Sequence, residues 1–160
     1  MSSPVPTSSG WQPDPSTGMR AYKWAIAVTL LVIVGNPLGE RFQLYENTLW
    51  YDVVMHALAG AGVSFLIAGY VETRGSSFVW RLRPRLTVIL TLLIIGLLWE
   101  ALEAFYDIAG EPVGSYAYLI DTCKDLADDC LGSYTACLIV WWPRRAHFTP
   151  VAQAVTAPSR

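Results

Sequence analysis

Acidic side chains and one histidine recur at helical spacing within the most apolar parts of this sequence. Asp52 precedes His56 by four residues, and Glu103 follows Glu100 by three. The full set of candidate site residues is Asp52, His56, Glu100, Glu103, Asp121, Asp125, Asp128 and Asp129. Residues three, four or seven positions apart share one face of a helix, so each group can present its polar atoms together. Carboxylates with one imidazole are ligands for Zn, Mn, Fe or Mg, and the set therefore predicts a divalent metal ion as cofactor.

The negative charge of this set is far larger than the positive charge beside it. Asp107 adds a further carboxylate, and Lys124 is the basic residue that lies within the series. An ionised carboxylate at the centre of a bilayer costs about 2.5–3.5 kcal/mol. The acids must therefore bind cations, be protonated, or be hydrated in a cavity. Three uses stay open: a divalent metal site, a relay for protons or ions, and a structural network of protonated acids.

Four apolar segments carry these residues. Hydrophobic residues make up 53% of the chain and charged residues 15%, whereas a soluble domain carries about 25% charged residues. The expected spans are about 21–39, 49–70, 86–108 and 116–142, and each is close to the roughly 20 residues that a bilayer core requires. The last span has four Asp in its first half, and the Trp141–Trp142–Pro143 sequence at its end favours a crossing. We therefore predict an all-α membrane protein, a four-helix transmembrane bundle.

The basic residues indicate how the spans are oriented. Nine of the eleven Lys and Arg lie in or beside residues 20–23, 74–85 and 144–160. The two opposite loops, about 40–48 and 109–115, have Arg41 as their only basic residue. Because basic loops stay in the cytoplasm, the pattern predicts a multi-pass protein of the bacterial cytoplasmic (inner) membrane with both termini cytoplasmic. The acids and His56 then lie in the outer half of the membrane.

The positions of the four spans and the composition of the flanking residues predict the domain organisation. Residues 1–19 are rich in Pro, Ser, Thr and Gly and are expected to form a disordered cytoplasmic tail. Residues 20–145 form the four-span domain, and residues 146–160 form a second cytoplasmic tail. Membrane lipid is the expected partner, and a homo-oligomer stays open. No basic patch is interleaved with aromatics, so nucleic acid is not expected as a partner.

Smaller features complete the expectations. Small residues at four-residue spacing in the second span, Gly60 among them, and Gly132 in the fourth predict close helix packing. Glu72, like the acids expected in loops, is interpreted as an ordinary surface residue. Three cysteines at a spacing of seven are interpreted as small apolar packing residues: Cys123, Cys130 and Cys137.

The combined motifs resemble a known family. They are D-x-x-x-H, then W-E-x-x-E, then D-T-x-x-D-x-x-x-D-x-x-G, over about residues 49–135. The matching residues are Asp52, His56, Gly60, Glu100, Glu103, Asp121, Thr122, Asp125, Asp129 and Gly132. This pattern resembles the YjdF-like family of bacterial inner-membrane proteins. The resemblance implies a membrane location and supports the acidic cluster, and it implies no particular activity.

Three functions are compatible with these residues. A metal enzyme would use the cluster to activate water or to polarise a lipid-like substrate. A cation or proton transport or sensing component would bind its ion there, although the inner halves of the spans are nearly all apolar. A non-catalytic assembly protein would use the acids to join helices or to dock a basic partner.

Overall fold

The described part of the chain is built from helices. The computed structural model describes residues 13–74, 84–106 and 111–142. Its helices are α1 (Pro15–Arg41), α2 (Leu44–Asn47), α3 (Leu49–Arg74), α5 (Pro84–Tyr106) and α6 (Tyr116–Trp141). Those three described ranges contain no strand, which confirms the all-α expectation.

The first helix begins earlier than its composition indicates. Asp14 is the N-cap, and its side chain accepts a hydrogen bond from the Ser16 backbone N–H at 3.0 Å. Pro15 follows at the first helical position, where its missing N–H costs nothing. Residues 15–19, expected in the N-terminal tail, are therefore helical, because the capping signal prevails over the loop-like composition. Residues 1–12 and the second expected tail, 146–160, lie outside the described residues.

Three of these helices are long and apolar enough to cross a membrane: Pro15–Arg41, Trp50–Arg74 and Pro84–Tyr106. Large apolar side chains point outward from them, and Leu31 and Ile94 are 59% and 60% exposed. Such surfaces are matched by lipid rather than by water. The fourth long helix, α6, has 26 residues, which is enough length for a crossing. The acids and Lys124 in its first half set it apart from the other three.

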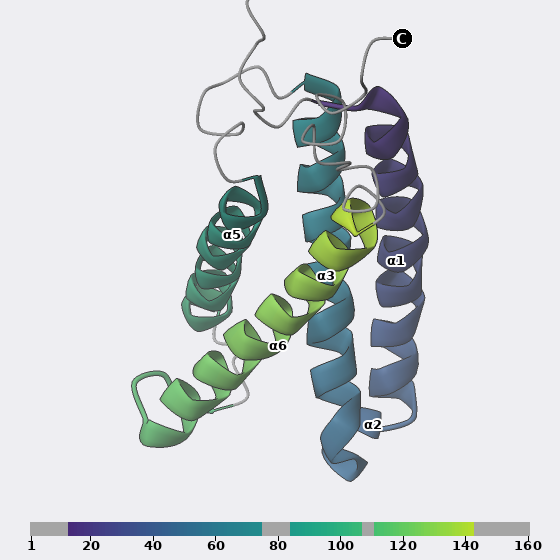
Figure 1. Cartoon of the computed structure of the whole chain (residues 1–160). Coiled ribbons are helices and arrows are strands. Elements are labelled where there is room, and N and C mark those ends of the chain that lie inside the picture. Colours follow the sequence, from purple (N-terminus) through teal and green to yellow (C-terminus); the bar gives the residue numbers. More distant parts are fainter. Residues whose placement is uncertain (1–12, 75–83, 107–110, 143–160) are drawn as a thin grey trace, which may run out of the picture.

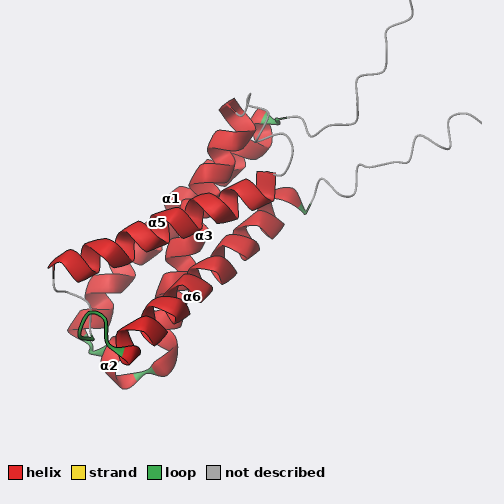
Figure 2. Cartoon of the chain, turned by 90° about the vertical axis from the view of Figure 1, so that its left-hand side faces the viewer, coloured by secondary structure: helices red, strands yellow, loops and turns green. Residues whose placement is uncertain are grey.

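The long helices are arranged around α3. Helix α1 packs along one side of α3, α6 packs along another, and α5 lies mainly against α6 (Figures 1 and 2). Successive long helices run in opposite directions (Figure 1). The ends of α1 and α5 and the starts of α3 and α6 therefore lie toward the same side, which we call the cluster end. The start of α1 and the end of α6 lie at the opposite end.

Helices α3 and α6 approach each other so closely that glycine is required at two positions. A Cβ atom on Gly132 would lie 1.8 Å from the carbonyl oxygen of Ala57. A Cβ atom on Gly60 would lie 2.3 Å from the carbonyl oxygen of Asp129. The expected close packing at these glycines is confirmed. One turn away, buried Ser64 donates a hydrogen bond to Ser133 at 2.7 Å, which joins the same two helices.

The core continues toward the opposite end as a layer of small and medium side chains. It includes Ala25, Phe65 and Ala136, from three different helices. Cys137 is buried in this layer, Cys130 is half-buried and Cys123 is exposed, and all three are free thiols. Packing is therefore the role of Cys137, as expected, whereas Cys123 lies on an outer surface.

Glu72 is a buried structural residue, and its interpretation as a surface loop residue was wrong. Helix α3 continues to Arg74, so Glu72 lies within its last turn and is 0% exposed. The indole N–H of Trp141 donates to its Oε1, and the backbone N–H of Asp14 donates to its Oε2 at 2.7 Å. One carboxylate thus joins the start of α1, the end of α3 and the end of α6.

Candidate metal centre

The close packing of α3 on α6 brings polar side chains from the two helices together. Asp52 and His56 lie one turn apart near the start of α3, and Asp125 lies on the facing turns of α6. The contacts at Gly60 and Gly132 fix the distance between the two backbones just beyond this level. The side chains therefore converge because the small residues allow the helices to touch.

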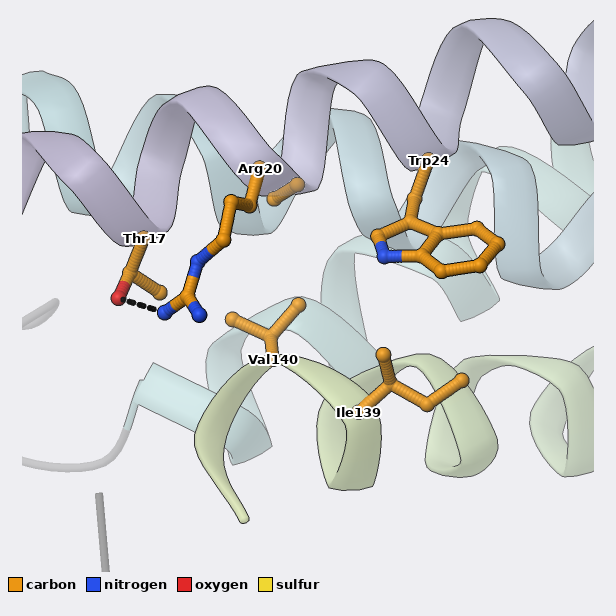
Figure 3. Close-up of a pocket in the computed structure, with 6 residues that line it drawn as sticks. Thr17, Arg20, Trp24, Ile139 and Val140 are labelled. Carbon is orange, nitrogen blue, oxygen red and sulfur yellow. Dashed lines mark hydrogen bonds between the residues drawn. The ribbon is translucent and has the colours of Figure 1, made fainter. Parts of the chain in front are cut away.

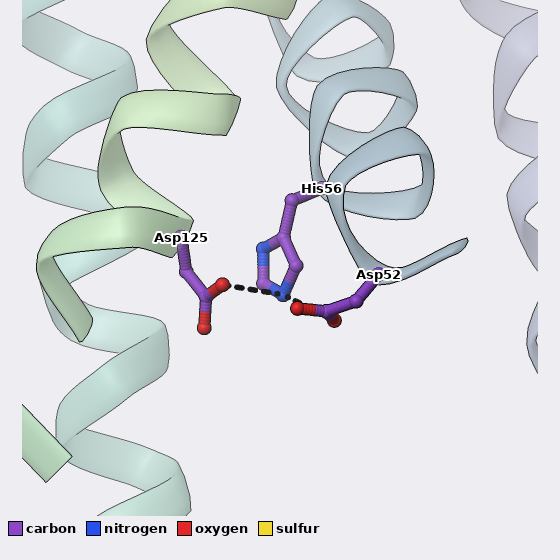
Figure 4. A group of neighbouring side chains, drawn as sticks. All are labelled: Asp52, His56 and Asp125. Carbon is purple, nitrogen blue, oxygen red and sulfur yellow. Dashed lines mark ion pairs between the residues drawn. The ribbon is translucent and has the colours of Figure 1, made fainter. Parts of the chain in front are cut away.

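The imidazole of His56 lies between two carboxylates (Figure 4). Its Nε2 is 3.5 Å from Oδ1 of Asp52 and 3.6 Å from Oδ1 of Asp125. One ligand atom from each of the three residues lies within 4.8 Å of the others. Both distances are too long for a good N–H···O hydrogen bond. Two ligand atoms bound about 2.1 Å from one tetrahedral metal ion are about 3.4 Å apart, so the spacing fits such an ion.

The second ring nitrogen of His56 faces another carboxylate. Its Nδ1 is 3.8 Å from Oδ1 of Asp129, one turn after Asp125 on α6. Histidines that bind metals usually donate their other N–H to a carboxylate or carbonyl, which sets the tautomer and the ring orientation. Asp129 is placed for that role after a small shift of its side chain.

Lys124 brings positive charge to the same place. Its ammonium contacts Oδ2 of Asp52, lies 2.7 Å from Oδ1 of Asp125 and lies 3.6 Å from Oδ1 of Asp121. Lys124 therefore balances part of the acidic charge at this place. Because the ammonium shares an oxygen of Asp125 with the imidazole, it is also placed to compete with a metal ion.

The remaining predicted residues lie around this centre rather than in it. Glu100, on α5, is buried and accepts a hydrogen bond from the Thr122 hydroxyl at 2.9 Å, which joins α5 to α6. Glu103 is half-buried one turn beyond it and lies beside Trp99. Asp121 is half exposed. Asp107 lies outside the described residues.

Asp128 is the predicted acid whose side chain is least satisfied by hydrogen bonds. One of its oxygens, Oδ2, is buried and makes no hydrogen bond within the described ranges. Among those residues, the group that brings three potential metal ligands together is Asp52, His56 and Asp125. The structure thus selects three of the eight predicted residues as a compact triad, with Asp129 next to them.

Two polar residues that join helices, one beside the centre and one at the opposite end, were not predicted from the sequence to do so. Thr122 appears in the D-T motif, but nothing in its type indicated that it would bind Glu100 on another helix. Glu72 had a usable signal, because it follows Phe65 by seven residues and Ala68 by four. That spacing places it on the buried face of α3.

Comparison with known proteins places the chain in a family. Residues 16–146 match the model of a family described as Predicted membrane protein (DUF2238). An uncharacterised protein of Thermotoga maritima is 27% identical over 119 residues, which cover 73% of this chain and 61% of that protein. The chain thus spans less than two thirds of the length of this relative. No solved structure matches. Since the family model covers most of the sequence, the chain belongs to the Predicted membrane protein (DUF2238) family, in agreement with the resemblance carried by its acidic motifs.

Proposed function

We propose that this membrane protein binds a divalent metal ion through Asp52, His56 and Asp125. The observation that carries the proposal is the pair of distances from His56 Nε2 to the two carboxylates, 3.5 and 3.6 Å. These distances are long for hydrogen bonds, and they are close to the distance between two ligand atoms bound to the same tetrahedral metal ion. Asp129, on the other side of the imidazole, supplies the outer carboxylate that metal-bound histidines commonly have.

Charge balance supports a divalent ion. Asp52, Asp125 and Asp129 together carry −3 and the ammonium of Lys124 carries +1, so with a neutral imidazole a divalent ion makes the group neutral. Neutrality matters because an uncompensated charge in a medium of low dielectric constant is costly. The mixed oxygen and nitrogen donors favour Zn²⁺, Mn²⁺ or Fe²⁺ over Mg²⁺, which prefers oxygen ligands.

The proposed reaction class follows from the number of ligands. Three protein ligands leave a coordination position for water, which is the arrangement of catalytic rather than structural metal sites. A metal-bound water is a nucleophile at neutral pH. Large apolar side chains such as Phe105 and Ile120 are exposed on the helices that flank the centre. A lipid-like substrate, approaching through the bilayer, is the class that such surroundings admit.

The proposed topology has four crossings, with the cluster end on the outer side of the bacterial inner membrane and both termini in the cytoplasm. Its support is the distribution of basic residues along the sequence, and the described ones near the opposite end include Arg20, Arg74 and Arg85. The crossing of α6 is supported by its 26-residue length and by the large apolar side chains that its second half exposes, Leu131 and Ile139 among them.

Thiol labelling tests this topology. In a chain whose three native cysteines are replaced by alanine, Glu111→Cys should react with a membrane-impermeant maleimide added to intact cells. Ser76→Cys, in the segment between α3 and α5, should react only after the membrane is permeabilised, because the proposed topology puts that segment in the cytoplasm. The reverse pattern of labelling would refute the orientation.

Metal-dependent stability tests the metal site. The melting temperature of the detergent-solubilised protein should rise with Mn²⁺ or Zn²⁺ and fall with a chelator. A ligand that binds only the folded state, present at a hundredfold excess over its Kd, stabilises the protein by about 2.7 kcal/mol. The effect should be larger at pH 8 than at pH 5, since protons compete with the metal for the same side chains.

Matched variants make the test specific. Asp125→Asn and His56→Ala should each remove most of the response to metal. Glu103→Gln removes an acid from the neighbouring helix α5 and should leave the response in place. If the response survives in His56→Ala, or if elemental analysis finds no metal in protein that was exposed to Mn²⁺ and Zn²⁺, the proposal fails.

The contacts of Lys124 favour a second candidate function, non-catalytic assembly of the membrane domain. Its ammonium joins Asp52 of α3 to Asp125 of α6. With a protonated His56, the two aspartates are then neutralised without any metal. In that case the cluster is a polar joint between helices, and metal has no effect on melting. The metal titration above separates the two functions directly.

A further inference from the structure

A small cavity lies between α1 and α6 near the opposite end, far along the helices from the metal centre. Its lining residues are Thr17, Arg20, Ala21, Trp24, Ile139 and Val140 (Figure 3). Its volume is about 50 Å³. A cavity of this size is large enough to admit a small polar group.

The guanidinium of Arg20 is held in position at this cavity. One of its nitrogens donates a hydrogen bond to Oγ1 of Thr17 at 3.0 Å, as Figure 3 shows. Buried Thr17 in turn donates to Oδ2 of Asp14 at 2.6 Å. Arg20 makes no ion pair among residues 13–74, 84–106 and 111–142. A guanidinium has five N–H donors, so most of those on Arg20 are available to an incoming anion.

The carboxylates at this end are already engaged elsewhere. Hydrogen bonds from the side chains of Thr17 and Ser16 lower the pKa of Asp14 to about 2, so it stays ionised at neutral pH. Its charge serves to cap α1 and to fix Thr17. Glu72 is fully buried under Trp141 and the Asp14 backbone. The cavity mouth therefore presents the positive charge of Arg20.

The other walls suit an acyl chain. Trp24 is 51% exposed, and its ring stacks on Phe65 with centroids 6.1 Å apart, which holds the indole in place. Figure 3 shows its indole nitrogen on the side of the ring nearer Arg20. Ile139 and Val140 form the apolar wall on α6. Tryptophan is enriched where lipid headgroups meet the hydrocarbon core, so Trp24 favours a position of the cavity at the depth of a lipid phosphate.

We propose that this cavity binds the phosphate of an anionic phospholipid, with Arg20 as the phosphate ligand. The guanidinium matches a phosphate in a two-point contact, as arginine commonly does. The hydrocarbon chains of the lipid then lie against Ile139 and the outer face of α1. A zwitterionic lipid is disfavoured, because its ammonium group would approach Arg20 with the same sign of charge.

Melting of the full chain in detergent tests the site with dioleoyl phosphatidylglycerol as the probe. In 0.3 M NaCl, which screens diffuse attraction between exposed charges, phosphatidylglycerol should raise the melting temperature more than phosphatidylcholine does. Arg20→Gln should weaken the apparent affinity about tenfold, as expected for the loss of a charge-assisted contact. Lys23→Gln removes one charge from the same stretch of α1 outside the cavity and should change the affinity less than threefold.

A second variant and a soluble probe complete the design. Ile139→Trp fills the cavity from α6 while Arg20 is kept, and it should also abolish the preference for phosphatidylglycerol. Glycerol 1-phosphate at the same concentration should give no shift, because it lacks the acyl chains. Equal losses in Arg20→Gln and Lys23→Gln would show general surface attraction and overturn the site. An equal shift with glycerol phosphate, or with phosphatidylcholine, would overturn the assignment to an anionic lipid.

Discussion

Replacement of Gly132 by alanine should destabilise the protein by about 2 kcal/mol. The new Cβ would lie 1.8 Å from the Ala57 carbonyl oxygen, which belongs to the backbone of α3 and cannot rotate away. Overpacking of this kind costs about 3 kcal/mol, against about 1 kcal/mol gained from the higher helix propensity of alanine. Helices α3 and α6 must separate, and the hydrogen bond between Ser64 and Ser133 lies next to the contact.

Gly62→Ala is the matched control for this prediction. It makes the same chemical change inside α3, but its Cβ would meet its nearest neighbour, Oγ1 of Thr29, at 3.4 Å, which is an ordinary contact. This variant should be as stable as the parent protein or more stable by up to about 1 kcal/mol. Unfolding by a denaturing detergent, followed by circular dichroism, measures both variants. Equal stabilities would contradict the close approach of the two helices.

Loss of the Lys124 charge should destabilise the folded protein by an amount similar to that for Gly132→Ala. Lys124→Met keeps the aliphatic stem but leaves Asp52 and Asp125 without their ammonium partner. Removing one member of a buried ion pair costs about 3–5 kcal/mol, and the 38% exposure of the Lys124 side chain reduces this to about 2 kcal/mol. The loss should be smaller at pH 5 than at pH 8, because protons can replace the ammonium in neutralising the carboxylates.

The same variant distinguishes the two candidate functions. If a metal ion binds Asp52, His56 and Asp125, removing the competing ammonium should raise the apparent affinity for Mn²⁺ about tenfold and restore the lost stability. If the cluster is a metal-free joint, Mn²⁺ should leave the variant as unstable as before. Lys124→Arg keeps the charge and is the control. A double variant with Asp52→Asn measures the coupling between the two side chains.

Helical periodicity was enough to predict pairs within one helix. Asp52 and His56 are four residues apart in the sequence, and their side chains meet in the structure. The small residues likewise predicted close helix packing, and Gly60 and Gly132 make such a contact between α3 and α6. These predictions succeeded because they depend on the geometry of a single helix or on the size of a residue.

The choice among the acids of α6 could not be made in this way. Asp121, Asp125, Asp128 and Asp129 were all predicted as site residues, because positions three, four or seven apart share one face of a helix. In the structure Asp129 faces His56, whereas Asp121 is half exposed. The side of α6 that faces α3 is set by where the two helices cross, at Gly132. The spacing of residues within α6 alone does not show where that crossing lies.

The contact between Glu72 and Trp141 has a consequence for the order in which the membrane domain is assembled. During synthesis α1 and α3 are made long before Trp141, which is the last residue of α6. Until that helix arrives, Oε1 of Glu72 lacks the indole donor, while Oε2 already faces the backbone N–H of Asp14. The carboxylate therefore links the start of α1 to the last turn of α6. A chain truncated before Trp141 lacks one of the two hydrogen bonds that tie the end of α3 to its neighbours, so α6 completes this joint only when its final residue has been made.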